Sequence, residues 1–101
     1  MLNTGGSVFL GQGAGASDLH NNNYNVFIGE KAGNKNTSGG ANTAIGYYSN
    51  YSSVLGYFNS TYGYMSLYHN TFGKYNTVNG AMSLYNNTTG KSNTVSGFNA
   101  L

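Results

Sequence analysis

The sequence contains no cysteine, no proline and no tryptophan among its 101 residues, and only 6% of its residues are charged. The absence of cysteine excludes a disulfide-stabilised scaffold. Two acidic residues and two histidines are few for acid–base or metal chemistry, so we expect no enzymatic activity, no metal and no cofactor. A formal net charge of +2 is not the basic surface by which proteins bind nucleic acid.

Long apolar stretches are also missing. The chain has no run of 18 apolar residues, so we expect no membrane insertion, and without a basic segment followed by an apolar one at its start we expect no signal peptide. Leucine, isoleucine, valine and phenylalanine together number 19, too few for a conventional two-layer core. Glycine, asparagine, serine and threonine make up just over half of the chain, and ten tyrosines and five phenylalanines supply most of the large apolar surface.

The strongest signal in the sequence is an internal repeat with a period of seventeen positions. One glycine series keeps this spacing: Gly29, Gly46, Gly63, Gly80 and Gly97. A second glycine series keeps it as well: Gly39, Gly56, Gly73 and Gly90. Asparagine holds a third register: Asn25, Asn42, Asn59, Asn76 and Asn93. The chain is therefore one repeat region, 1–101, with units 7–24, 25–41, 42–58, 59–75, 76–92 and a partial unit 93–101.

Each unit has a few strand-forming residues directly before its first glycine. These segments are Val26–Ile28, Thr43–Ile45, Ser60–Tyr62, Thr77–Val78 and Thr94–Val95. A unit of this length is too short for two helices and a turn, and its composition disfavours helix. We therefore predict an all-β parallel solenoid, or β-roll, of about six coils. Each coil would contain two short strands, joined by glycine corners with positive φ, and would rise roughly 4.8 Å.

Equivalent residues of stacked coils lie directly above one another in such a fold. The asparagines from Asn25 to Asn93 would form a ladder of amides, and Tyr51, Tyr68 and Tyr85 would form a column of aromatic rings. These ladders would take the place of a deep aliphatic core. The competing interpretation is a disordered, prion-like tract rich in asparagine and tyrosine, but such tracts do not usually keep a fixed register.

One segment resembles a known adhesin motif. Asn42-Thr43-Ala44-Ile45-Gly46 is similar to the Asn-Ser-Val-Ala-Ile-Gly motif of trimeric autotransporter adhesin heads, the YadA-like group, with weaker copies at 25–29 and 76–80. The segment from 76 to 101 also looks like the Asn-Thr-Ala-Ile-Gly repeats of large bacterial surface proteins and phage tail-fibre-like proteins. The resemblance covers residues 25–101 and implies a parallel β-roll, usually trimeric, in an extracellular fibre.

The sequence departs from the adhesin pattern in two respects. Its repeat, which runs from Asn42 to Phe58 for example, is longer than that of the adhesin heads. Tyr62, Asn79 and Ser96 also replace the aliphatic residue expected before the first glycine. We expect these later coils to have a wetter interior or to turn this position toward a partner chain. No ligand-binding residue is transferred by the resemblance.

Other short patterns are better explained by the repeat than by a catalytic or metal site. The glycine-rich segment 11–15 lacks the helix and the acidic residue of a phosphate-binding βαβ unit. His20 and His69 occupy different repeat positions and have no cysteine or carboxylate pair beside them. Asp18 alone does not supply the one aspartate per coil that calcium-binding glycine repeats need, and no serine is singled out for a triad.

Two columns favour a binding function as the alternative. One would present hydroxyl groups at the coil spacing and so suggests ice binding, although valine and serine make the column irregular: Val26, Thr43, Ser60, Thr77 and Thr94. The simpler explanation is that threonine is a good strand residue. The tyrosines would form an aromatic face for a glycan or another surface, or would be buried between the chains of an oligomer, which we favour.

The sequence therefore predicts a structural shaft or head segment of an extracellular fibre or adhesin. Its partner would be itself, as a homotrimer or an end-to-end filament, with surface glycans as further partners. Its location would be outside the cell, at the cell surface or on a virion tail. The alternative function is a module that binds a surface or a glycan, such as a tail-fibre segment, with ice binding less favoured.

Overall fold

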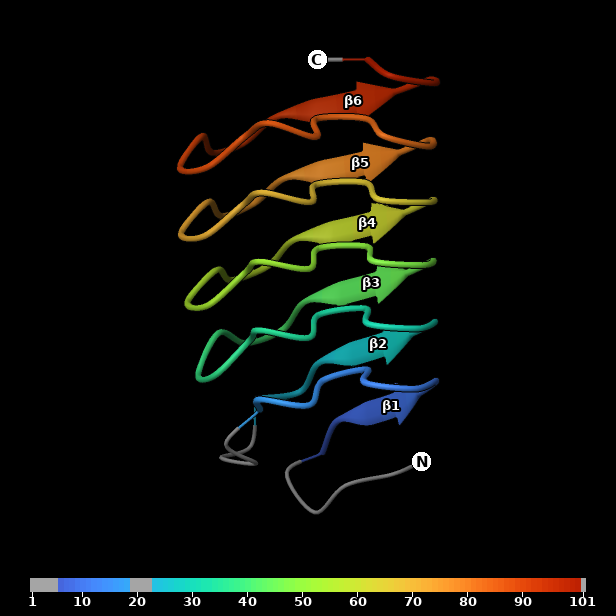
Figure 1. Cartoon of the computed structure of the whole chain (residues 1–101). Helices are drawn as coiled ribbons and strands as arrows, with labels where there is room; N and C mark the ends of the chain where they lie inside the picture. The colour runs from blue at the N-terminus through green and yellow to red at the C-terminus, as the bar shows by residue number, and fades with distance from the viewer. Residues whose placement is uncertain (1–5, 19–22, 101) are drawn as a thin grey trace.

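The computed structural model describes residues 6–18 and 23–100. It contains six strands of three residues each, paired in chain order in one parallel sheet. The strands are β1 (Val8–Leu10), β2 (Val26–Ile28), β3 (Thr43–Ile45), β4 (Ser60–Tyr62), β5 (Thr77–Asn79) and β6 (Thr94–Ser96). Figure 1 shows them stacked one above another along the axis of the molecule. The described residues form no helix, and the predicted parallel β-solenoid is confirmed.

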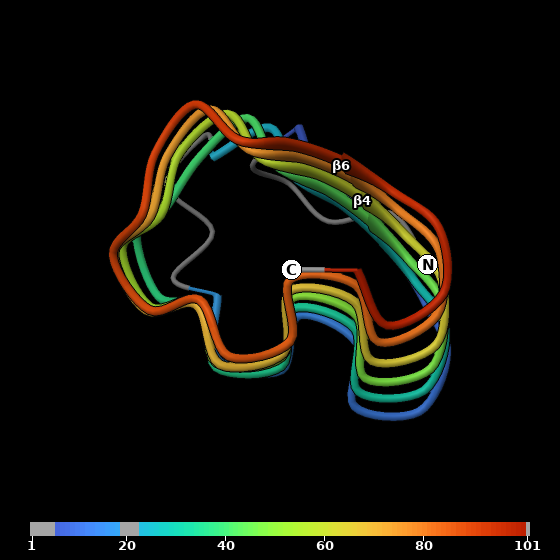
Figure 2. The ribbon, with the colours of Figure 1, turned by 90° about the horizontal axis from the view of Figure 1, so that it is seen from above.

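The strands pair in strict register from coil to coil. Val26 lies opposite Thr43, and Thr43 lies opposite Ser60, so neighbouring coils are offset by one full repeat. Only the first step, from Val8 to Val26, is one position longer. The molecule measures 35 × 22 × 15 Å. Seen from the C-terminal end, the chain turns clockwise as it rises toward the viewer, so the solenoid is left-handed (Figure 2).

Each coil contains one strand, so the prediction of a second strand in each unit is wrong. Left-handed residues interrupt the chain two and four residues after the first glycine, as at Tyr48 (φ 55°) and Asn50 (φ 51°). A strand needs consecutive extended residues, so these positions prevent one from forming. The backbone amides of these two residues nevertheless bond to neighbouring coils. Tyr48 N donates to Glu30 O at 2.9 Å, and Asn50 N donates to Ser66 O at 2.8 Å.

The two glycine series serve different purposes. The first series, which includes Gly29, Gly46 and Gly63, has φ between 117° and 133°, a region that L-residues avoid. The second series lies outside the left-handed region, so the prediction that Gly39, Gly56, Gly73 and Gly90 form positive-φ corners is wrong. Glycine is required at these positions because neighbouring atoms leave no room for a Cβ atom.

Gly56 shows why the second series needs glycine. A Cβ atom there would lie 2.7 Å from Ser53 Oγ, 2.8 Å from Gly73 O and 2.9 Å from Asn59 Nδ2. All three distances are shorter than the van der Waals contact distance between a carbon atom and a nitrogen or oxygen atom that is not bonded to it. The backbone at Gly56 therefore packs directly against both an asparagine side chain and the next coil.

Two inward-facing columns lie against each other, so that a large residue in one is matched by a small residue in the other. The central residue of each strand points inward, and the rings of Phe9 and Phe27 stack there with centroids 5.5 Å apart. A Cβ at Gly33 would come within 2.5 Å of the Phe27 ring, and Gly15 stands in the same relation to Phe9. In the later coils the inward strand residues are smaller: Ala44, Thr61 and Val78. The positions equivalent to Gly33 are then occupied by larger residues: Asn50, Leu67 and Leu84.

The first and third residues of each strand face outward. Ile45 is 37% exposed and Tyr62 is 40% exposed, while the equivalent Asn79 and Ser96 are also exposed. The expectation that Tyr62, Asn79 and Ser96 make the interior wetter is therefore wrong. Their side chains line the outer surface of the sheet, where polar residues carry no desolvation cost.

We predict that Gly63→Ala destabilises the protein far more than Gly97→Ala. Both glycines have strongly positive φ, so each substitution brings backbone strain of order 1–3 kcal/mol. A Cβ at Gly63 would also lie 2.7 Å from the backbone carbon of Gly80, whereas nothing lies within 4 Å of one at Gly97. The clash should add about 1–3 kcal/mol, measured by urea unfolding followed by circular dichroism. Equal losses in the two variants would contradict the close packing of successive coils.

Candidate functional site

The asparagine ladder links every coil to the next through the backbone. Asn42 N donates to Asn25 Oδ1 at 2.9 Å, and Asn59 N donates to Asn42 Oδ1 at 2.9 Å. The same bond joins the next two pairs, at 3.1 Å each. From Asn59 onward the amide nitrogens also donate to the oxygen of the preceding amide, at 3.0–3.2 Å. Asn25, Asn42, Asn59 and Asn76 are buried, and Asn93, at the end of the ladder, is half-buried.

The same amides close each coil onto its second glycine. Asn42 Nδ2 donates to Gly56 O at 2.8 Å, and Asn59 Nδ2 donates to Gly73 O at 2.8 Å. The bonds from Asn25 to Gly39 and from Asn76 to Gly90 are 2.9 Å each. One asparagine thus ties both ends of its own coil together and holds the coil above it. The asparagine and second-glycine registers repeat together because each pair forms one hydrogen bond.

A second polar column runs inside the solenoid. It consists of Asp18, Asn36, Ser53, Asn70 and Asn87. The asparagines of this column donate to the same glycine carbonyls, for example Asn36 Nδ2 to Gly39 O at 3.1 Å. The pairs Asn36-Thr37, Asn70-Thr71 and Asn87-Thr88 are the signal for this column in the sequence.

Asp18 ends this polar interior at the N-terminal side. Its carboxylate accepts hydrogen bonds from the amides of Asn23 and Asn25 at 3.1 Å each, and from Asn36 at 3.2 Å. Asp18 is 6% exposed, and these three amide donors give its buried carboxyl group the hydrogen-bond partners that it needs. Asp18 thus serves the packing of these coils, a role that its lone occurrence in the sequence does not reveal.

Some buried polar atoms in the middle coils have no protein partner. Asn50 is fully buried, and neither its Oδ1 nor its Nδ2 makes a hydrogen bond to the protein. Ser53 Oγ and Asn36 Oδ1 are in the same state. Nearby, the hydroxyl of Ser49 is 2.7 Å from that of Thr61 and 3.1 Å from that of Ser66. The interior of coils two to four is therefore largely polar.

Tyr51, Tyr68 and Tyr85 form a continuous column on the surface opposite the sheet. Adjacent ring centroids are 5.1 Å apart, with interplanar angles of 12° and 15°. Such stacking is favourable beyond simple burial. His69 is exposed and lies edge-on against the rings of Tyr68 and Tyr85, at 4.8 and 4.9 Å. Because the ring faces contact one another, the column offers edges and hydroxyl groups to solution.

Further groups extend the tyrosine column at its N-terminal end. The Tyr48 ring lies 4.8 Å from that of Tyr51, and Tyr47 stacks on Tyr64 at 5.3 Å. The ammonium of Lys35 lies 5.6 Å from the centre of the Tyr51 ring, in cation–π contact. Partial burial, followed by the neighbouring phenols of Tyr51 and Tyr85, raises the pKa of Tyr68 above its ordinary value. The Tyr68 phenol is therefore uncharged at neutral pH.

Exposed aromatic residues gather at a different corner of the solenoid, the aromatic corner. It consists of Leu55, Tyr57, Phe58, Phe72 and Tyr75, all at least 36% exposed. Phe58 and Tyr75 stack with centroids 5.3 Å apart and are 54% and 56% exposed. Lys74 lies over the Tyr57 ring at 5.7 Å. This corner exposes large aromatic surface beside a positive charge, whereas the rings of the tyrosine column are stacked face to face and only partly exposed.

The structure also places the remaining candidate residues. One column holds the first position of successive strands and faces outward, and four of its five residues carry a hydroxyl group: Val26, Thr43, Ser60, Thr77 and Thr94. Within the glycine-rich segment, Gly11, Gly13 and Gly15 are positive-φ corners of the first coil. His20 lies outside the described residues. No group of three potential metal ligands, and no helix suited to crossing a membrane, occurs among residues 6–18 and 23–100.

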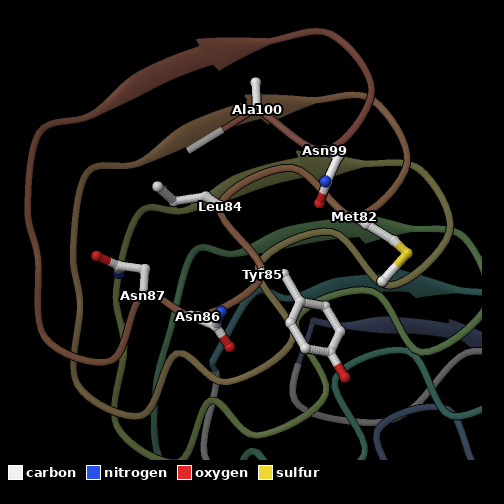
Figure 3. A pocket seen from close by; sticks show the side chains of 7 residues that line it. All are labelled: Met82, Leu84, Tyr85, Asn86, Asn87, Asn99 and Ala100. Atoms are coloured by element: carbon white, nitrogen blue, oxygen red, sulfur yellow. The ribbon is translucent and has the colours of Figure 1, made fainter.

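A pocket lies at the C-terminal end of the stack. It has a volume of about 260 Å³ and is lined by Met82, Leu84 and Tyr85 from below and by Asn99 and Ala100 from the last coil (Figure 3). Leu67, the residue equivalent to Leu84 one coil earlier, is fully buried, whereas Leu84 is half-buried. The pocket therefore exposes side chains that earlier coils cover with a neighbour.

Comparisons with models of protein families, with curated proteins and with solved structures find no match to this chain.

We predict that Asn59→Ala costs about 3 kcal/mol of unfolding free energy, whereas Asn93→Ala costs less than about 1 kcal/mol. Asn59→Ala removes the donor to Gly73 O and leaves the amide of Asn76 without its acceptor, both in the interior. Asn93 holds the same position at the end of the ladder and is half-buried. Thermal unfolding of both variants tests this, and equal effects would show that the ladder is not what holds the coils.

Proposed function

We propose that the protein is a structural repeat module of an extracellular fibre or adhesin that associates with further copies of itself through its coils. The β-solenoid architecture is compatible with such a role. The resemblance of its repeats to those of bacterial surface proteins and tail-fibre-like proteins supports the extracellular location. The same resemblance supports a shaft or head position within a longer assembly.

The observation that carries this proposal is that successive coils are joined by repeating contacts. Strand pairing recurs at every step along the axis, the asparagine ladder runs from Asn25 to Asn93, and stacked tyrosines join three successive coils. The contacts of an inner coil are therefore the contacts by which a further coil of the same kind would be held. Val78, for example, is fully buried between its neighbouring coils.

End-to-end stacking would use two different surfaces of the molecule, the N-terminal side of one copy and the C-terminal side of the next. Head-to-tail contacts form a closed ring only when the rotation between successive copies brings the last copy back to the first. Copies stacked along one axis do not return in this way, so they produce filaments. A homotrimer would instead bring together the sides of the solenoid, for example through the outer face of the sheet. The two arrangements differ in which residue of β6 becomes buried.

We predict that Val95→Lys prevents assembly and that Ser96→Lys leaves it intact. Val95 points into the open end of the solenoid, so a lysine there would have to be buried, uncompensated, against the next copy. Ser96 is its neighbour on the same strand but faces outward. Sedimentation velocity over a range of concentrations, with electron microscopy for filaments, measures the difference.

The two variants also separate the modes of association. Loss of assembly in Ser96→Lys alone would indicate side-by-side association through the sheet, as in a trimer. A wild-type chain that stays monomeric at every concentration would overturn the proposal of self-association. Both variants keep the added charge close to solvent, so circular dichroism should confirm that each remains folded.

A second candidate function is binding of a glycan or another surface at the aromatic corner. The exposed stacked pair Phe58 and Tyr75 favours it, because exposed aromatic surface next to a cation is typical of interaction sites. We predict that the Phe58→Ala, Tyr75→Ala double variant loses adhesion to glycan-coated surfaces but assembles normally. Tyr62→Ala, on the sheet face, is the matched control. Adhesion that is equal in all three proteins would exclude this function.

A further inference from the structure

We propose that the tyrosine column is a site of oxidative cross-linking, in which a one-electron oxidant joins Tyr68 to Tyr85 as dityrosine and so links two successive coils covalently. The column places phenol rings from neighbouring coils against each other at 5.1 Å between centroids. The inference rests on the geometry of this column and does not depend on whether copies of the chain assemble.

Proximity makes the coupling intramolecular. Two groups held in contact react at effective concentrations far above those of free molecules. Tyr51, Tyr68 and Tyr85 are each partly exposed, so an oxidant reaches their edges. Coupling also needs the rings to slide past one another, because the new bond forms between ring carbons next to the oxygen and not between stacked ring centres.

The chemistry is balanced with hydrogen peroxide as oxidant and a haem peroxidase as catalyst. Each of two phenols loses one electron and one proton to give a phenoxyl radical. The radicals couple through one ortho carbon of each ring, and the hydrogens on those carbons then move to the oxygens. One molecule of hydrogen peroxide takes up the two electrons and two protons and is reduced to two molecules of water.

The structure distinguishes tyrosines that have a tyrosine neighbour from tyrosines that have another partner. Tyr75 stacks on Phe58, and Tyr57 lies beneath Lys74. Tyr75 is more exposed than Tyr85, so an oxidant that selected by exposure alone would attack it first. Pairing across the column, in contrast, favours Tyr85.

Trypsin resolves the two outcomes, because the chain has four lysines and no arginine. Cleavage after Lys35, Lys74 and Lys91 places Tyr68 in peptide 36–74 and places Tyr85, together with Tyr75, in peptide 75–91. The dilute full-length chain is treated with horseradish peroxidase and hydrogen peroxide, and the monomer band of a denaturing gel is digested. We expect peptide 36–74 joined to peptide 75–91, with the mass of two hydrogen atoms lost, and dityrosine fluorescence in that band.

Conservative variants keep the test independent of folding, because phenylalanine preserves the stacked ring. Tyr85→Phe and Tyr68→Phe should each lose the joined peptide, and Tyr75→Phe should keep it. A joined peptide that disappears in Tyr75→Phe would overturn the proposal. So would a wild-type monomer band without the joined peptide, or one that forms equally well in urea, where the column no longer exists.

Discussion

The hydrogen bonds of the buried asparagine amides are the constraint on which the rest of the structure depends. Each amide bonds to the backbone of the next coil and to the glycine carbonyl that closes its own coil. The buried side chains include few large aliphatic residues, so there is little aliphatic burial to replace these bonds. Aromatic stacking on the outside adds a second continuous contact along the same axis.

The spacing of residues along the chain predicted the fold because a solenoid turns sequence period into spatial columns. The glycine, asparagine and tyrosine registers share one period, which predicted the length of a coil and the stacking of equivalent residues above one another. The internal layout of a coil was less predictable. Left-handed conformations occur at residues with no sequence signal for them, such as Phe58, Met65 and Leu67, because hydrogen bonds to adjacent coils impose them.

The candidate site was predictable to different degrees. The asparagine ladder followed from the register, but its bonds to the second glycines did not, because a hydrogen bond between two positions of the same coil leaves no pattern of its own. Side-chain direction was the main source of error. Tyr62 was expected to affect the interior, yet the alternation of inward and outward residues in β4 puts Thr61 inside. The tyrosine column presents ring edges and hydroxyl groups to solution, whereas the aromatic corner presents large aromatic surface. The amino-acid composition alone does not distinguish these two surfaces.

The left-handed residues have a consequence for how the chain folds. Every full coil holds three positions at φ of about 50–75°, in addition to its first glycine, and an L-residue there is about 1–2 kcal/mol less stable than in a right-handed conformation. Their amides recover this energy only when an adjacent coil accepts them. A solitary coil is therefore unstable, and formation of a first pair of coils is the slow nucleation step. Each later coil is templated by the one before it, so the molecule should grow as a zipper along its axis.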